Sequence, residues 1–363
     1  MARAKKRRSL PVRLLRGLGI LILVIVILAA VLIGFLSATE YRPADRETVP
    51  AAVGASRALR VGDSLRLISW NIGYGALGDN ADFFMDGGTG VKTADADRVR
   101  GNMGAILDTV VRLEPDVIFF QEIDLDSTRS SHINELAEAR RALPGYDSAF
   151  ANNFKVAFLP YPVPPIGKVD SGVATFSAFP MADAERVQLP IPFAWPIRMA
   201  NLKRCVLITR VPVEGSDREL VLMDLHLEAY DNGEGKAAQT AALAELLNAE
   251  AARGNYVIAG GDFNQIFSSA DGSAYPAQPG KWTAGEIDVT RIDGDWQFLM
   301  DSAVPSCRSL DQPYIGADRD SFQYYLIDGF ICSGNLRVEA LETQDLGFVA
   351  SDHNPVLLSV TLE

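Results

Sequence analysis

Strand-like apolar runs bordered by acidic, amide or histidine side chains recur along this chain, and they constrain its fold more than any other feature. The run Asn255–Ala259 is uncharged, β-branched and aromatic, which predicts a buried strand. Six strand ends carry such polar groups: Asn71; Glu122; His226; Asp262 with Asn264; Asp328; and Asp352 with His353. One polar strand end is unremarkable, because strands must reach solvent somewhere. Six drawn from the same four residue types, including two of the three histidines, indicate a functional site.

The segment Gly260-Gly261-Asp262-Phe263-Asn264 follows the strand near residue 259. We expect the two glycines to let the backbone turn sharply where a Cβ would clash. Asp262 and Asn264 occupy alternate positions, so their side chains are predicted to point the same way. The carboxylate could then orient or deprotonate a water, and the amide could donate to a phosphate oxygen. The alternative is an Asx turn that caps a helix, which Asp and Asn also favour.

The first forty residues predict a membrane anchor. Residues 1–16 contain seven Lys or Arg and no acid, whereas residues 17–38 carry no charge and are mostly Leu, Ile, Val and Ala. A helix of that length covers roughly 33 Å, enough to span a bilayer core. The basic flank predicts a cytoplasmic N-terminus and a single-pass cell-membrane protein whose domain is extracytoplasmic. A cleaved signal peptide is the alternative, although Leu36-Ser37-Ala38 lacks the small residue expected three positions before a cut.

Charge and cysteine content limit the partners of the remaining chain, in which residues 39–62 are predicted to be a linker and residues 63–363 a domain. All 46 acidic residues but only 27 of the 34 basic ones follow position 16, which gives a net charge of about −19. Avid binding of duplex nucleic acid is therefore not expected, while a small phosphate ester held by a metal remains compatible. The three cysteines show neither a zinc pattern nor a disulfide framework and are expected to fill the core. The sequence carries no signal for an oligomeric state.

The hydrophobic patterns predict strands alternating with helices. Strands are expected at 65–71, 116–120, 146–158, 170–177, 202–211, 219–225, 255–259, 324–331 and 356–362, and helices at 93–113, 131–142 and 235–253. A glycine-rich loop is expected at 72–90 and an apolar, proline-spaced loop at 189–199. His132 is predicted to lie on the polar side of the second of these helices, as a surface residue.

Six short motifs, taken together, resemble the endonuclease/exonuclease/phosphatase superfamily with its DNase I-like fold. In chain order they are Ser69-Trp70-Asn71, Gln121-Glu122, His226-Leu227, Gly261-Asp262-Phe263-Asn264, Ile327-Asp328 and Ser351-Asp352-His353. They span residues 69–353, essentially the whole predicted domain. The resemblance implies an α/β (α+β) fold, a four-layer sandwich of two packed mixed β-sheets flanked by helices. Here it would be preceded by one N-terminal transmembrane helix, and the site would lie at one end of the sandwich.

The resemblance also implies a metal site. Asn71, Glu122 and Asp352 would hold Mg²⁺ or Mn²⁺. Mg²⁺ typically takes one or two carboxylates, several waters and the substrate phosphate, so this set is sufficient.

The other motif residues would carry the chemistry. Asp262 would orient or deprotonate the attacking water, while Asn264 and His226 would contact phosphate oxygens. His353 would stabilise the transition state or move a proton. Asp328 would contact His353, fix its tautomer and raise its pKa.

The resulting prediction is a membrane-anchored, metal-dependent phosphoesterase that hydrolyses a phosphodiester or phosphomonoester by water attack. The anchor and the 189–199 loop favour a lipid or inositol headgroup, unless that loop serves only for packing. An extracytoplasmic nuclease acting on DNA or RNA is the alternative, which a basic groove across the site would support. A non-catalytic binding module on the same fold is a further alternative, against which the complete Glu, Asp and His set argues. His226 in a His-Leu pair resembles the DNase I, sphingomyelinase and inositol-phosphatase branches rather than the abasic-site branch.

Overall fold

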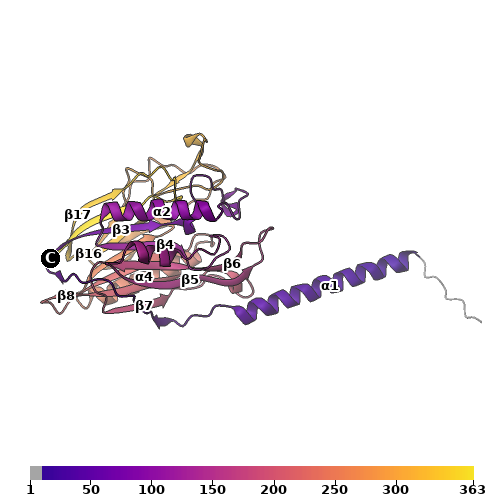
Figure 1. Cartoon of the computed structure of the whole chain (residues 1–363), viewed down its shortest axis with the longest axis horizontal. Coiled ribbons are helices and arrows are strands. Elements are labelled where there is room, and N and C mark those ends of the chain that lie inside the picture. Colours follow the sequence, from indigo (N-terminus) through magenta and orange to yellow (C-terminus); the bar gives the residue numbers. More distant parts are fainter. Residues whose placement is uncertain (1–9) are drawn as a thin grey trace, which may run out of the picture.

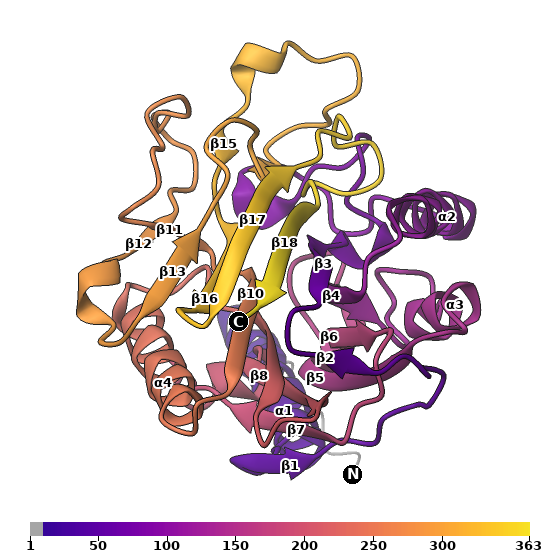
Figure 2. The ribbon, with the colours of Figure 1, turned by 90° about the vertical axis from the view of Figure 1, so that its left-hand side faces the viewer.

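Two mixed β-sheets pack face to face and helices cover their outer faces (Figures 1 and 2). The computed structural model describes residues 10–363; residues 1–9, part of the predicted cytoplasmic segment 1–16, lie outside the described residues. The predicted four-layer sandwich is confirmed.

The first sheet has six strands in the order β17-β18-β3-β4-β6-β5, of which only β3 and β4 are parallel neighbours. They are β3 (Ser64–Asn71), β4 (Val117–Asp124), β5 (Asp147–Leu159), β6 (Gly167–Ser177), β17 (Leu336–Thr343) and β18 (Val356–Leu362). The parallel pair places the ends of β3 and β4 at the same edge of the sheet.

The second sheet has the order β1-β7-β8-β9-β10-β16-β13, with β2 pairing to β8. Its strands are β1 (Arg46–Thr48), β2 (Leu59–Arg60), β7 (Asp183–Gln188), β8 (Cys205–Glu214), β9 (Glu219–His226), β10 (Tyr256–Asp262), β13 (Trp296–Leu299) and β16 (Asp328–Ser333). Residues 39–62, which we predicted to be a linker, thus contain two strands that pair with this sheet. Two small sheets join β11 (Gln265–Phe267) to β12 (Gly285–Ile287) and β14 (Cys307–Arg308) to β15 (Tyr324–Tyr325).

Three helices belong to the outer layers of the sandwich. Figure 2 shows α2 (Ala96–Leu113) and α3 (Glu135–Ala142) on one side of the sheets and α4 (Glu234–Ala251) on the other. Each helix buries its apolar stripe against the nearer sheet.

Capping residues explain why two helices begin later than predicted. Asp95 accepts a hydrogen bond from the Arg98 amide (2.9 Å), and Asn134 accepts one from the Ala137 amide (2.8 Å). His132 therefore precedes α3 rather than lying on it. Its side chain is exposed and pairs with Asp126, so its prediction as a surface residue is confirmed.

The alternation of side chains along the strands builds the core. Leu67 and Phe119 of the first sheet pack against Ile258 and Phe330 of the second. Phe120, one residue after Phe119, instead points to the opposite face and packs under α2 and α3. Because both faces of each sheet are covered, the central strands are almost continuously apolar until they reach their polar ends.

The prediction that Gly260 and Gly261 form a sharp turn is wrong, since both lie inside β10. A Cβ at Gly260 would lie 2.5 Å from the Phe330 ring, and one at Gly261, where φ is +146°, would overlap the carbonyl oxygen of Leu225. The glycines therefore allow close packing of β10 against its neighbours. The turn comes after the end of β10, at Asn264, which has a φ of +52°.

Asp328 does not end a strand as predicted, because the run 324–331 is divided into β15 and β16 and Asp328 begins the second. Since β16 runs antiparallel to β10, its first residue lies beside the last residue of β10. Asp328 therefore still reaches the same sheet edge as Asp262.

The fourth helix, α1 (Leu10–Thr39), extends away from the sandwich (Figure 1). By length and composition it can cross a membrane, with a mean hydropathy of 3.3 over its most apolar window. Its C-terminal end packs against the domain through Leu36, which is buried.

Candidate active site

Strand register brings the predicted residues into two facing rows. In the second sheet, Asp262 is directly opposite His226 on β9 and Asp328 on β16. In the first sheet, Asn71 pairs with Gln121. The rows meet where the Asn71 amide nitrogen donates to Asp262 Oδ2 at 3.0 Å. Residues from 71 to 328 therefore converge at one end of the sandwich.

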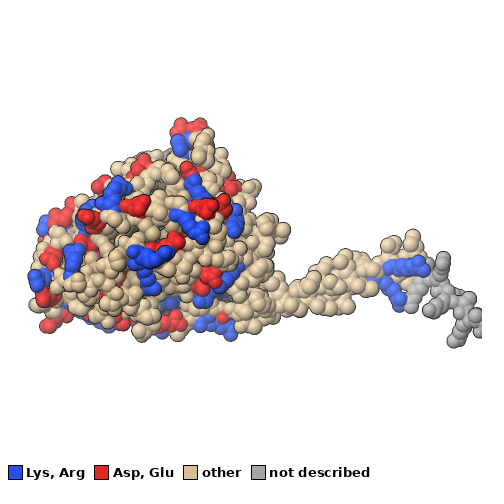
Figure 3. All heavy atoms as spheres, in the orientation of Figure 1, with Lys and Arg blue, Asp and Glu red and all other residues tan. Residues whose placement is uncertain are grey.

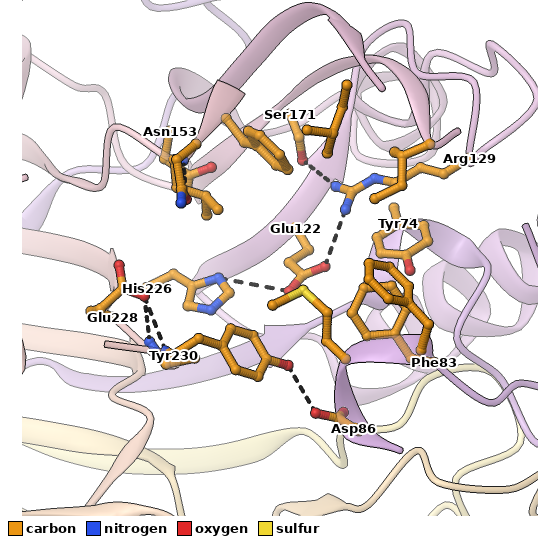
Figure 4. A pocket seen from close by; sticks show the side chains of 18 of the residues that line it. Tyr74, Phe83, Asp86, Glu122, Arg129, Asn153, Ser171, His226, Glu228 and Tyr230 are labelled. Carbon is orange, nitrogen blue, oxygen red and sulfur yellow. Dashed lines mark hydrogen bonds and ion pairs between the residues drawn. The ribbon is translucent and has the colours of Figure 1, made fainter. Parts of the chain in front are cut away.

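A β-bulge directs Glu122 into this site. The pairing of β4 with β6 shifts between Gln121 and Ile123, and Glu122 has a φ of +55°. Gln121 points between the sheets and donates to Asp224 (2.8 Å), whereas Glu122 faces the cavity. Figure 4 shows Glu122 between His226 and Arg129.

Hydrogen bonds hold the segment 351–353 against the end of β3. The Ser351 hydroxyl donates to the Asn71 carbonyl (2.8 Å), and the Trp70 indole donates to the His353 carbonyl (2.9 Å). They place His353 Nδ1 2.8 Å from Asp328 Oδ2, which is the contact that we predicted. Nε2 of the same ring lies 3.8 Å from Asp262 Oδ2.

Asp262 is the centre of this cluster. Besides Asn71, its Oδ2 contacts Nε2 of His226 at 3.3 Å. Burial, together with the nearby charge of Asp328, raises the pKa of Asp262 to about 7. A carboxylate with such a pKa is suited to accept a proton near neutral pH.

The two histidines of the site have opposite electrostatic environments. Burial lowers the pKa of His353, but the Asp328 carboxylate outweighs burial, so this pKa lies well above its usual value. Burial, followed by the charges of Arg204 and His353, holds the pKa of His226 well below its usual value. These surroundings favour the protonated form of His353 and the neutral form of His226.

His226 presents an unpaired nitrogen to Glu122. When Asp262 is ionised, its contact with His226 requires the proton on Nε2, which leaves Nδ1 as an acceptor. Nδ1 is buried, has no hydrogen-bond partner within residues 10–363, and lies 4.0 Å from Glu122 Oε1. Two acceptors that face each other in this way fit a cation or a water between them.

The neighbouring oxygen donors also fit a hard divalent cation. Burial raises the pKa of Asp352 to about 6 although the His353 and Arg308 charges lower it, and the carboxylate of Glu122 adds to the rise. The Asn71 amide oxygen accepts from the Gly73 amide (3.1 Å) and keeps its second lone pair. Carboxylate and amide oxygens are ligands that Mg²⁺ and Mn²⁺ prefer.

Asp262 forms the Asx turn that the sequence left open, but this turn caps no helix. The backbone amide of Asn264 donates to Asp262 Oδ1 (2.9 Å), which helps to orient that carboxylate. The side-chain amide of Asn264 donates to the Leu227 carbonyl (2.9 Å), which uses one of its two hydrogens. The positive φ at Asn264, rather than strand alternation, determines where this side chain lies.

Sequence reasoning missed two buried arginines. Arg129 donates to Asp124 (2.9 Å), lies 3.9 Å from Glu122 and covers the Tyr74 ring at 3.7 Å (Figure 4). Arg204 donates to the His226 carbonyl at 3.2 Å. Arg129 lies in a segment without periodicity and Arg204 at the start of a predicted strand, and in neither case does a local pattern indicate a site residue.

The polar cluster forms one end of a cavity of about 780 Å³. The rest of its wall is mainly apolar and comes from the loops at 72–90 and 189–199, from the segment near Tyr161, and from the end of α1. Both loops whose role the sequence left open thus line this cavity.

Comparisons with known proteins agree with this fold. The model of the Endonuclease/Exonuclease/phosphatase family matches residues 68–353. An endonuclease/exonuclease/phosphatase from Beutenbergia cavernae DSM 12333 is 18% identical, with a TM-score of 0.55 over 82% of this chain and 72% of that one. The human Nocturnin catalytic domain with bound sulfate anion is 16% identical, with a TM-score of 0.51; the match covers 87% of this chain and 98% of that one. D. rerio TDP2 complexed with a single-strand DNA product is 15% identical, with a TM-score of 0.51; the match covers 82% of this chain and 99% of that one. The sequence has no significant match among curated proteins.

Proposed function

The chain belongs to the endonuclease/exonuclease/phosphatase family, and from this premise we propose that it is a membrane-anchored, metal-dependent phosphoesterase. It would hydrolyse a phosphodiester or phosphomonoester by attack of water. The observation that carries the proposal is the convergence on Asp262 of Asn71, His226 and His353 from separate parts of the chain.

Each of these residues has a role that its surroundings support. Asp262 accepts the proton of the attacking water, which suits its raised pKa. His353, held protonated by Asp328, stabilises the charge that develops on the phosphoryl oxygens or gives a proton to the leaving group. Asn264 has one amide hydrogen free to contact a phosphate oxygen. His226 would keep Asp262 in place through Nε2, and it would serve as the second phosphate contact only in a form that also carries a proton on Nδ1.

Asn71, Glu122 and Asp352 would hold the metal, Mg²⁺ or Mn²⁺. When bound, such an ion polarises the phosphoryl group and offsets its negative charge. Arg129 lies 3.9 Å from Glu122 but forms its closer ion pair with Asp124, at 2.9 Å. It can therefore restrain the Glu122 side chain, while the charge of Glu122 is still left to be balanced by a divalent cation.

We expect the full-length protein in detergent, supplied with Mg²⁺, to hydrolyse bis-p-nitrophenyl phosphate. A substrate panel with DNA, sphingomyelin and phosphoinositides would then rank the natural classes. Asp262→Asn should lose the activity, because it removes the proton acceptor and keeps the shape, while His132→Ala on the surface should keep it. Absence of turnover with every substrate in both Mg²⁺ and Mn²⁺ would favour the non-catalytic binding module instead.

A nuclease is the second candidate, because a protein of the same fold, D. rerio TDP2, is complexed with a single-strand DNA product. The charge of this chain weighs against it. The predicted domain is strongly acidic, and Arg129 and Arg204 in the cavity are buried and paired with acids. Such arginines offer no exposed basic track to a long polyanion.

We propose that α1 spans the cell membrane with the domain outside, since seven basic residues precede its uncharged run. Protease added to intact cells should then remove the domain and leave the anchor. As the control for cell integrity, a cytoplasmic protein in the same cells should remain uncleaved until the cells are lysed. A domain that is protected until lysis contradicts this orientation, and a mature protein that begins near Thr39 and is free in the medium contradicts the anchor.

A further inference from the structure

We propose that the catalytic cavity opens onto the membrane and accepts a lipid phosphoester, with its phosphate at the Asp262 end and its alkyl chain along α1. The inference rests on the proposed hydrolase and adds the substrate class and the route of entry. Four observations carry it: the wall formed by α1, the fixed junction between α1 and the domain, an apolar rim, and the distribution of charge in the cavity.

The end of the anchor helix forms part of the cavity wall. Leu32, Ile33 and Leu36 line the same cavity as Glu122 and Asp262. All three belong to the uncharged run 17–38. The cavity therefore reaches the part of the chain that is expected to lie in the bilayer.

The junction between α1 and the domain is a packed one. Ser37 Oγ lies 3.0 Å from Met199 Sδ, and Leu36 is buried. Glu40, the first charged residue after the uncharged run, is itself buried and lies 3.1 Å from Arg198 and 3.9 Å from Lys203. Because no free spacer separates helix from domain, the mouth of the cavity is held at the membrane surface.

Exposed apolar side chains lie at the cavity wall or within two residues of it in the chain. Tyr161, Val163, Trp195 and Ile197, here called the apolar rim, are 67%, 92%, 58% and 64% exposed. Tyr161 and Ile197 also line the cavity. On the face shown in Figure 3, the end of the domain next to α1 carries few charged side chains. Trp and Tyr favour the interfacial layer of a bilayer, so this rim is suited to contact lipid.

The charge distribution in the cavity fits an amphiphile with one polar end. Its only Lys or Arg side chains within residues 10–363 are Arg129, Arg204 and Arg308, which are all almost fully buried. The Asp262 cluster supplies much of the polar lining, with Asp86, Asn153 and Glu228 elsewhere in the wall, and the rest of the lining is mainly apolar. A phosphoester with a long alkyl chain fits such a cavity. Its phosphate would lie at the polar cluster, and its alkyl chain would lie against the apolar wall, where burying each CH₂ is favourable.

The test uses p-nitrophenyl phosphodiesters whose second ester is ethyl, octyl or hexadecyl. With the full-length protein in phosphatidylcholine vesicles and Mg²⁺, kcat/KM should rise at least about tenfold from the ethyl to the hexadecyl ester, given the contribution of each buried CH₂. Ile197→Glu should reduce this hexadecyl-to-ethyl ratio, since it places a charge on the apolar rim. Val111→Glu, at an apolar position on α2 that is 51% exposed, should leave the ratio unchanged.

The outcomes separate this inference from the hydrolase proposal. Turnover of the ethyl ester with no gain for longer chains overturns the lipid substrate and leaves the hydrolase standing. The same ratio in the wild type and in Ile197→Glu overturns the route along the rim. Absence of turnover for every ester contradicts both proposals.

Membrane contact has a readout that does not depend on activity. In vesicles containing a lipid brominated near its headgroup, the fluorescence of Trp195 should be quenched, and Trp195→Phe should lose the quenched component. Trp70, in the interior of the domain, serves as the unquenched reference. Equal quenching in the wild type and in Trp195→Phe overturns contact of the rim with lipid.

Discussion

Replacing Glu122 with glutamine should reduce hydrolysis to the background rate, a loss of at least about 10³-fold, as for other groups that stabilise transition-state charge. Glutamine keeps the shape of the side chain but removes the anionic oxygen that the bulge in β4 directs into the site. The rate should be measured across a Mg²⁺ titration and again in excess EDTA. Binding of Mn²⁺ to the protein, followed by electron paramagnetic resonance, reports the metal site without reference to activity.

Glu138→Gln is the matched control for this experiment. Its side chain on α3 is 25% exposed, against 24% for Glu122, but among residues 10–363 its only ion pair is with Arg141. It should retain the rate and the Mn²⁺ affinity of the wild type. Full activity of Glu122→Gln, or of the wild type in excess EDTA, would exclude the metal-assisted mechanism.

Asp328 and His353 should behave as one functional unit. His353→Ala and Asp328→Asn should each lower kcat by about 10²–10⁴-fold, the range for a positioned acid–base group. KM should change less, because the charge of His353 matters most as the transition state forms. The double mutant should be little worse than His353→Ala alone, since Asp328 acts through the ring nitrogen that it contacts at 2.8 Å.

The same pair predicts the direction of a pH effect. His353 works in its protonated form, so activity is lost as pH rises through its pKa. Asp328 holds that pKa well above the usual value, and Asp328→Asn removes the main cause. The alkaline limb of kcat/KM should therefore move to lower pH in Asp328→Asn, and the histidine pKa measured by NMR should fall with it.

A double-mutant cycle on kcat/KM separates this role from its alternatives. If the two single losses multiply, Asp328 does not serve His353 and belongs to the metal site or to the fold. An alkaline limb that stays in place in Asp328→Asn would lead to the same conclusion. Asp126→Asn provides the matched control, because that carboxylate pairs with the surface residue His132.

The sequence by itself determined the elements and the residue types of the site. Apolar periodicity predicted strands that end at Asn71 and at His226, and a strand shortly before Asp262, because the pattern of burial along a strand is a local property. The length and lack of charge of residues 17–38 likewise predicted a membrane-spanning helix, since they depend on no other part of the chain.

Only the tertiary structure decided how these residues are used. The two glycines of β10 are required by the neighbouring strands, and Asp328 reaches Asp262 because β16 runs antiparallel to β10. Arg129 lies 3.9 Å from Glu122 although the segment between them has no regular hydrophobic pattern. The end of α1 contacts the domain through Ser37 and Met199, which are 162 residues apart in the chain. Contacts of this kind depend on which segments become neighbours after folding, and neither periodicity nor local spacing contains that information.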